Sequence, residues 1–140
     1  MGATTVLLPV FVEVALTLGL LFWVGSMRVA AVRSGLVKTR DIALREPNWP
    51  PHILRVANAY QSQLELPVLF YLVSVLALFT GRASLLLVVL AWLFVVSRLL
   101  HALIHVTTNN VPRRFFVFLA GAILVSLMWL VFAADLVFGA

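Results

Sequence analysis

Four apolar stretches of bilayer-spanning length constrain the fold of this 140-residue chain most strongly. A transmembrane helix needs about 20 predominantly apolar residues, and the stretches cover 5–32, 53–80, 84–107 and 112–138. Hydrophobic residues make up 64% of the chain and charged residues 11%, whereas a soluble domain has roughly 25% charged residues. We therefore predict an all-α integral membrane protein, in which residues 1–140 form one domain, an up-down bundle of four transmembrane helices.

The distribution of basic residues predicts the orientation of these helices. Arginines and a lysine surround the first loop, near 33–51, and Arg113 and Arg114 follow the third loop; the second loop carries only Arg82. By the positive-inside rule, the first and third loops are cytoplasmic and both termini lie on the other side. The net charge of +5 is explained by these loops, so we expect no nucleic-acid partner. We expect the first stretch to be retained as a helix, because no basic residue precedes it and Glu13 interrupts it.

Two sets of polar residues interrupt the apolar stretches. The first set is Asn58, Gln61 and Glu65, and the second is Arg98, His101 and His105. Each set has the spacing i, i+3, i+7, which places its members on one stripe of a helix. Ionisable groups are costly at membrane depth. We therefore expect the two stripes to face each other in the cytoplasmic half of the membrane, around a shared buried polar site.

The second stretch predicts a break beside its polar stripe. Its purely apolar part, 66–79, is too short to span a bilayer alone, so the preceding polar turns must lie in the membrane, shielded from lipid. Pro67 frees the carbonyl group of Gln63, which predicts a local kink. Glu65 and Arg98 are the deepest members of their stripes, and we expect them to form an ion pair.

The excess of positive charge around the stripes predicts an anionic ligand. Arg113 and Arg114 stand at the start of the fourth helix, where backbone N–H groups add positive potential, and Arg28 is nearby. Six aligned polar groups exceed what helix packing needs, although a purely structural role for them stays open. His101 and His105 have no carboxylate between them, so we predict no metal site.

Two further acids lie outside the stripes. Glu13 and Asp135 are single acids on the first and fourth helices. We assign them to helix contacts or to the membrane interface, with a proton relay as the open alternative. The chain has no cysteine, so any thiol chemistry must use a thiol that a ligand brings.

At these polar residues the chain resembles the MAPEG family, the membrane-associated proteins of eicosanoid and glutathione metabolism. The resemblance covers nearly the whole chain and is carried by NAYQSQLELP at 58–67 and RLLHALIHVTTNNVPRR at 98–114. The segment ELPVLFY at 65–71 is similar to the bacterial branch. The resemblance implies a homotrimer in the membrane lipids of the bacterial inner membrane, with glutathione bound as co-substrate between subunits near the cytosolic face. It implies a glutathione transferase or peroxidase whose lipophilic small-molecule substrate partitions from the bilayer.

The resemblance also implies roles for individual residues. Arg114 matches a catalytic arginine at the start of helix four, which holds the glutathione sulfur as thiolate. Glu65 matches a glutamate that binds the amino end of glutathione. The other positions implied to bind glutathione are Arg28, Asn58, Gln61, Ser62, Arg98, His101, His105 and Arg113.

Several positions depart from the family pattern. Three residues of the second stretch differ from the side chains that grip glutathione in the characterised enzymes: Asn58, Gln61 and Ser62. His105 replaces a tyrosine, and Phe115 and Phe118 replace a serine and a tyrosine near the thiol. These departures keep a second hypothesis open, a non-catalytic membrane protein that binds a small anion or a lipid headgroup, or a helix-packing scaffold.

Overall fold

The computed structural model describes residues 2–44 and 47–139. Within these ranges the chain forms α-helices, one short 3-10 helix and no strand. The elements are α1 (Ala3–Arg33), η1 (Thr39–Asp41), α2 (Pro51–Ser62), α3 (Leu66–Phe79), α4 (Leu85–Val106) and α5 (Val111–Phe138). Together α2 and α3 form one crossing, so the described chain has 4 helical segments long and apolar enough to span a membrane. The predicted all-α membrane architecture is confirmed.

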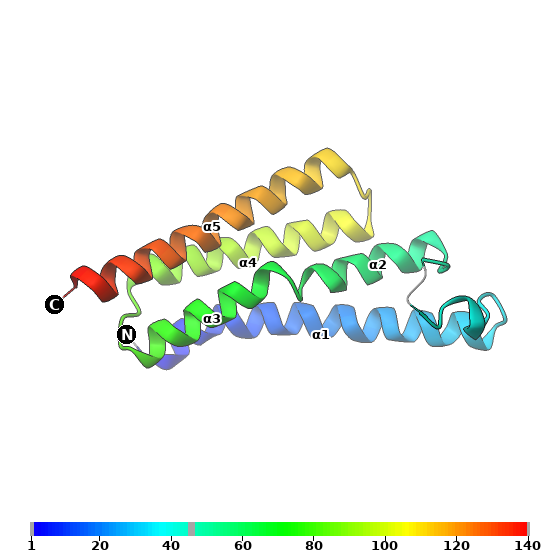
Figure 1. The fold of residues 1–140 in the computed structure, drawn as a ribbon, viewed down its shortest axis with the longest axis horizontal. Coiled ribbons are helices and arrows are strands. Elements are labelled where there is room, and N and C mark those ends of the chain that lie inside the picture. Colours follow the sequence, from blue (N-terminus) through cyan, green and yellow to red (C-terminus); the bar gives the residue numbers. More distant parts are fainter. Residues whose placement is uncertain (1, 45–46, 140) are drawn as a thin grey trace.

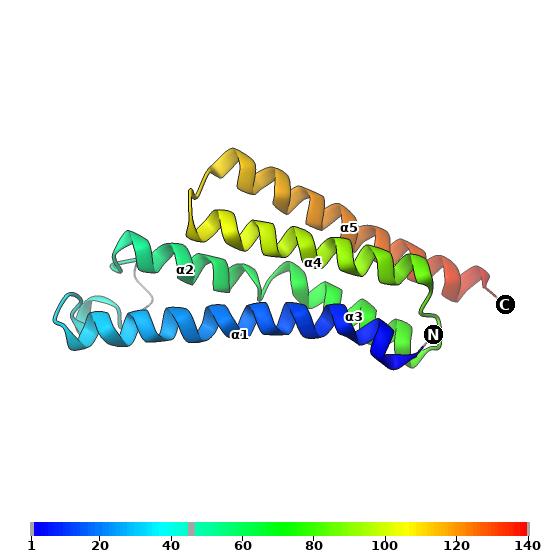
Figure 2. The same ribbon diagram turned by 180° about the vertical axis from the view of Figure 1, so that it is seen from behind.

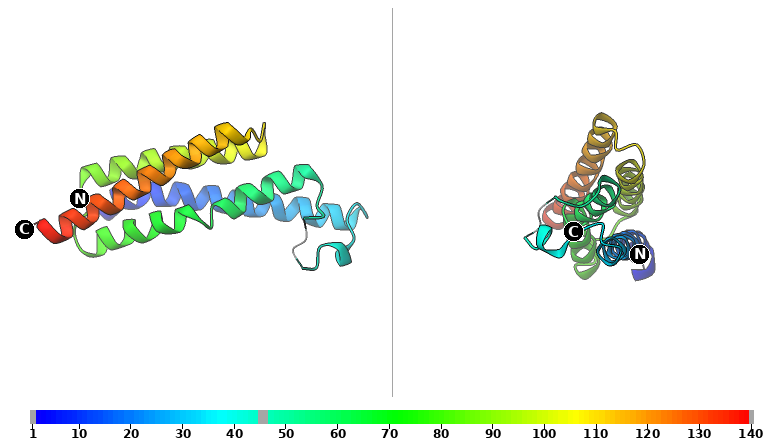
Figure 3. Two further views of the ribbon diagram at one scale, coloured as in Figure 1. Left: turned by 45° about the horizontal axis from the view of Figure 1, so that its top comes forward. Right: turned by 90° about the vertical axis from the view of Figure 1, so that its right-hand side faces the viewer.

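The crossings alternate in direction. Both termini and the α3–α4 loop lie at one end of the bundle, and the α1–α2 and α4–α5 loops lie at the other (Figures 1 and 2). α4 contacts α1, α2 and α5. α5 packs against α3 and α4 near the C-terminus and diverges from α2 toward the loop end (Figures 1 and 3). We call the end with the α1–α2 and α4–α5 loops the loop end. It is the end at which α5 and α2 lie apart.

Two apolar clusters hold the helices together. The termini-side cluster joins α3, α4 and α5 around Phe70, Phe94 and Met128, and the rings of Phe70 and Phe94 stack with centroids 4.8 Å apart. The loop-side cluster joins α1, α2 and α4, with Val24 and Ile53 at its centre. Since both clusters include residues of α4, this helix connects the two halves.

The break in the second crossing lies at the turn segment 63–65, between α2 and α3. The N–H of Glu65 bonds the carbonyl oxygen of Ser62 at 3.3 Å, three residues back instead of four. Pro67 lies in the first turn of α3, where its missing N–H leaves no helical bond unmade. The kink predicted from Pro67 is confirmed, and it leaves the carbonyl groups at the end of α2 in need of partners.

Candidate functional site

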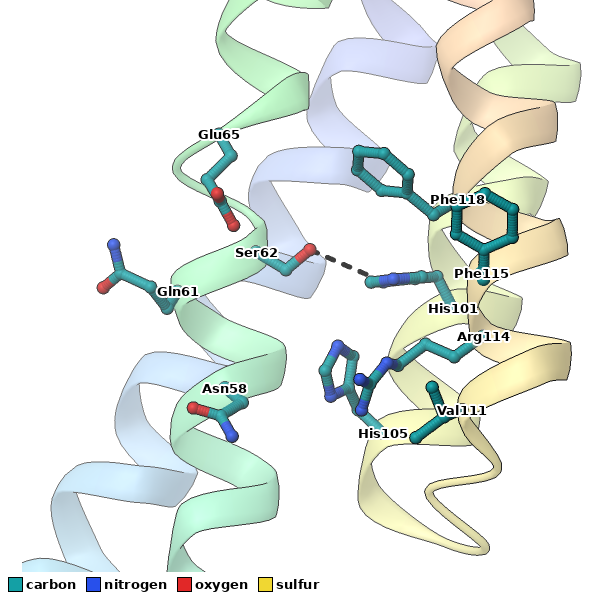
Figure 4. Close-up of a pocket in the computed structure, with 10 residues that line it drawn as sticks. All are labelled: Asn58, Gln61, Ser62, Glu65, His101, His105, Val111, Arg114, Phe115 and Phe118. Atoms are coloured by element: carbon teal, nitrogen blue, oxygen red, sulfur yellow. Dashed lines mark hydrogen bonds between the residues drawn. The ribbon is translucent and has the colours of Figure 1, made fainter. Parts of the chain in front are cut away.

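A cavity of about 420 Å³ opens between α2 on one side and α4 and α5 on the other (Figure 4). Three of its lining residues are apolar: Val111, Phe115 and Phe118. The other lining residues were all predicted site residues, and they are Asn58, Gln61, Ser62, Glu65, His101, His105 and Arg114. The structure therefore brings seven separately predicted positions to one cavity.

The two walls of the cavity differ in burial. On α4, His101 and His105 are buried, and their rings meet edge to face with centroids 4.7 Å apart. On the α2 side, Asn58, Gln61 and Glu65 are exposed in the single chain. Figure 4 shows Gln61 extending away from the two histidines. The α4 wall is thus a fixed surface, whereas the α2 wall is open on one side.

Arg98 lies behind this cavity and holds the end of α2. Its guanidinium is almost fully buried, and Nη2 donates to the carbonyl oxygen of Ser62 at 3.0 Å and to its Oγ at 2.5 Å. Ser62 is the last residue of α2, so this bond satisfies a carbonyl that the helix break has freed. A cation is also favoured at the negative end of a helix dipole.

The predicted ion pair between Glu65 and Arg98 is wrong. Across the described ranges, the single ion pair within 4.0 Å joins Arg40 to Asp41 in exposed sequence outside the bundle. Glu65 is exposed at the turn after α2, whereas Arg98 points to the backbone of Ser62. Spacing along each helix gave the correct faces, but the helix break redirected the guanidinium to a backbone acceptor.

Arg114 is anchored at the start of α5. Its Nη1 donates to Oδ1 of Asn109 at 2.5 Å, and Asn109 has a positive φ of 49°. The next residue, Asn110, caps the helix, because its Oδ1 accepts from the backbone N–H of Arg113 at 3.1 Å. The turn between α4 and α5 therefore sets the direction of the Arg114 guanidinium at the edge of the cavity.

Two predicted site residues lie elsewhere. The Arg28 guanidinium stacks over the Trp49 ring, 5.2 Å from its centroid, and lines a separate groove on α1. Arg113 is exposed and does not line the cavity. In this single chain neither residue contributes to the wall that Arg114 helps to form.

The sequence prediction missed the importance of Glu13 and Gln63. Glu13 is fully buried and Gln63 is 1% exposed. Both carboxyl oxygens of Glu13, and Oε1 of Gln63, have no hydrogen-bond partner among the described residues. Glu13 and Arg98 are both buried, yet no ion pair joins them within 4.0 Å in the described ranges. Glu13 was assigned to a helix contact or to the membrane interface, and its burial among the helices agrees with the helix contact. In the sequence, its burial was indicated by a single acid within an otherwise apolar helix.

No metal centre is evident in the part of the chain that the structure describes. Groups of three or more histidine, aspartate or glutamate side chains placed to hold an ion are absent there. His101 and His105 form a pair without a third ligand.

Comparison with known proteins identifies the family. The MAPEG family model matches residues 6–134, a range that includes the whole cavity and most of each of the four crossings. No curated protein and no solved structure gives a significant match to the chain.

Proposed function

Because the chain belongs to the MAPEG family, we propose that it is a glutathione-dependent membrane transferase or peroxidase acting on lipophilic electrophiles or lipid peroxides. The observation that carries the proposal is the meeting of Arg114 and Glu65 in one cavity. A fixed cation and a carboxylate suit the thiolate and the ammonium group of glutathione. The family match and the four apolar crossings make the chain an integral membrane protein of the glutathione and eicosanoid metabolism family.

Arg114 carries the chemistry in this proposal. An arginine stays protonated at physiological pH, and a nearby cation favours the thiolate over the thiol. The thiolate attacks an electrophilic carbon, forming a C–S bond as the leaving group departs. With a peroxide, the thiolate attacks the terminal oxygen and breaks the O–O bond, which forms glutathione sulfenic acid and an alkoxide that takes up a proton from water to become the alcohol. A second glutathione thiol then attacks the sulfenic acid and gives the disulfide and water.

The open α2 wall supports assembly as a homotrimer. Asn58, Gln61 and Glu65 are exposed in the single chain, yet polar groups at membrane depth need protein or water against them. A neighbouring subunit over this wall would shield them and enclose the ligand. Glutathione would then bind between subunits, and the lipophilic substrate would enter from the surrounding lipid.

The basic loops support a site that faces the cytoplasm. The cavity lies at the loop end of the bundle, next to the start of α5, where Arg113 and Arg114 stand. The positive-inside rule assigns this end to the cytoplasm of a bacterial inner membrane and both termini to the other side.

Substitution of Arg114 tests the proposal. We expect Arg114→Ala to lower the rate of glutathione conjugation or peroxide reduction about 100-fold, the loss typical of one stabilising donor. The rate is measured on protein reconstituted in liposomes. Arg113→Ala is the matched control, because it removes the same charge one residue away and outside the cavity. Full activity in Arg114→Ala would contradict the proposed role.

A non-catalytic anion or lipid-headgroup binder is the second candidate, and two phenylalanines favour it. Phe115 and Phe118 line the cavity beside Arg114 and are 58% and 37% exposed. A phenylalanine side chain has no hydrogen-bonding group, so this part of the wall offers a ligand only apolar contact. A ligand that binds the folded state raises the unfolding temperature. Stabilisation by glycerol phosphate and none by millimolar glutathione would favour this candidate; stabilisation by neither would favour a packing scaffold.

A further inference from the structure

Ser62 lies between an arginine and a histidine at the wall of the cavity. Its Oγ is 2.5 Å from Nη2 of Arg98 and makes a long hydrogen bond of 3.5 Å with Nδ1 of His101. All three side chains are buried. Figure 4 shows the bond from Ser62 to His101 crossing from α2 to α4. Because these side chains are buried, each polar hydrogen here needs a hydrogen-bond acceptor.

The direction of these hydrogen bonds follows from the chemistry of the three groups. A guanidinium has donors and no acceptor, so Oγ of Ser62 accepts from Arg98 and keeps its own proton to donate. In the described part of the chain, the other group bonded to Oγ is Nδ1 of His101. If His101 donated instead, the hydroxyl proton of Ser62 would be buried without an acceptor, which is costly.

A serine or threonine hydroxyl in a helix often donates its proton to the backbone carbonyl group one turn back instead. Thr17 donates to the carbonyl of Glu13, and Ser126 to that of Ala122. Ser62 makes no such bond among those of the described residues, and its Oγ points across to α4. The hydroxyl proton of Ser62 is therefore directed at His101.

We infer that Ser62 and Arg98 fix His101 as the neutral tautomer whose proton is on Nε2. A neutral imidazole has one donor nitrogen and one acceptor nitrogen, so acceptance at Nδ1 leaves the N–H at Nε2. His101 lines the cavity, where this N–H donates to an oxygen or a thiolate of the ligand. Ser62 and Arg98 act as positioning residues. The ligand contact rests on the proposed function of the cavity, whereas the tautomer does not.

Arg98 gives this arrangement its direction. Its Nη2 also donates to the Ser62 carbonyl oxygen, so two hydrogen bonds to one residue hold the guanidinium in place. Because an arginine never accepts a hydrogen bond, the Ser62 hydroxyl cannot donate to Arg98, and its proton stays available for His101. His105, one turn along α4, is different: its Nδ1 is buried and has no partner among the described residues. The structure therefore fixes the tautomer of His101 and leaves that of His105 unselected.

Nitrogen-15 NMR of the imidazole rings in the detergent-solubilised full chain tests the inference. The chain has 3 histidines, so His52→Gln, His101→Gln and His105→Gln assign the signals. We expect His101 without ligand to show a protonated Nε2 and an unprotonated Nδ1, while His105 shows averaged shifts. A protonated Nδ1 in wild-type His101 would overturn the inference, and this result needs no variant.

Two substitutions then test the role of Ser62. Ser62→Ala removes the donor, so we expect the His101 shifts to move toward averaged values. Ser62→Thr keeps a hydroxyl group, so we expect it to retain the wild-type pattern. Unchanged His101 shifts in Ser62→Ala would show that another group selects the tautomer, and would overturn the role of Ser62.

A glutathione titration followed at His101 separates this inference from the proposed function. We expect the Nε2 signal to move on binding, as its N–H gains an acceptor. If Nε2 is protonated and its signal moves with glycerol phosphate but not with glutathione, the inferred tautomer is supported and the proposed ligand is contradicted. If the His101 signals respond to glutathione but the proton is on Nδ1, the proposed ligand is supported and the inferred tautomer is contradicted.

Discussion

The two halves of the bundle belong to the same four crossings but are filled differently. At the termini side, α3, α4 and α5 enclose Phe70, Phe94 and Met128, each with 0% exposure. At the loop side, α5 no longer reaches α2, and a cavity with polar and charged walls takes the place of aromatic packing. The packed half therefore holds the helices against one another, while the open half leaves polar side chains facing a cavity.

A buried polar layer separates these halves. Along α4, Val95 belongs to the termini-side cluster and Ala102 to the loop-side cluster, with Arg98 between them. Glu13 on α1 and Gln63 after α2 have the same position between the clusters on their own segments. This layer is the part of the molecule where removal of one group leaves others buried without partners.

Replacement of Arg98, in the layer between the packed and the open half, should cause the largest loss of stability. We expect Arg98→Met to lower the free energy of unfolding by roughly 3–5 kcal/mol, because the carbonyl oxygen and Oγ of Ser62 each lose a hydrogen bond from a charged donor, and Glu13 stays buried with no cation in its layer. Unfolding in mixed micelles by titration with a denaturing detergent measures this change. Arg40→Met is the control; it removes an exposed pair with Asp41, worth less than about 1 kcal/mol.

A double substitution checks the reason for that loss. Glu13→Leu combined with Arg98→Met should be less destabilising than Arg98→Met alone, since no unpaired carboxyl group remains in the bundle. Equal or additive losses would show that Glu13 and Arg98 act independently.

Phenylalanines from the two halves provide the next contrast. We expect Phe94→Ala to destabilise the protein by about 3 kcal/mol through the cavity it leaves, the low end for a core phenylalanine because lipid is itself apolar. Phe115→Ala, at the open cavity, should leave the unfolding free energy nearly unchanged and alter ligand affinity instead. Similar unfolding losses for both variants would contradict the division into a packed and an open half.

Gly121 tests how closely α4 and α5 approach in the packed half. A Cβ at this position would lie 2.9 Å from Oγ of Ser97, which is buried and bonded to the carbonyl of Phe94. We expect Gly121→Ala to cost about 1–2 kcal/mol through overpacking. Gly25→Ala is the control, because a Cβ there meets nothing within 4 Å, and it should be neutral or slightly stabilising.

The smallest expected effect concerns the turn that positions Arg114. Asn110→Ala removes the side-chain cap of α5 and should lower stability by about 1 kcal/mol. Thr108→Ala in the same turn changes an exposed side chain with no helix cap to lose, so its unfolding curve should match the wild type. An identical loss in both variants would place the effect in the turn as a whole.

The sequence predicted the architecture and most of the cavity because both follow from local patterns. Apolar length predicted four crossings, and Pro67 predicted the break. The spacing of Asn58 to Glu65 and of His101 and His105 placed them on stripes that the structure brings to one cavity. Helical spacing is a property of a single segment, so it holds within α2 and within α4, whereas Glu65 lies past the end of α2 and reaches the cavity from the turn.

The sequence could not supply the pairings between segments. α1 is apolar around most of its circumference, so its pattern does not indicate which face is buried, and the complete burial of Glu13 went unpredicted. The Glu65–Arg98 pair was wrong because depth along two helices was matched without knowing where the turn 63–65 would direct each side chain. Arg28 was assigned to the site although the loop after α1 brings Trp49 under it.

Formation of the glutathione thiolate tests the central claim most directly. The purified protein is titrated with glutathione at neutral pH, and the thiolate is followed by its ultraviolet absorbance. The proposed role of Arg114 predicts a saturable thiolate signal in the wild type and in Arg113→Ala, and no signal in Arg114→Ala. An equal signal in Arg114→Ala, or none in the wild type at saturating glutathione, would contradict it.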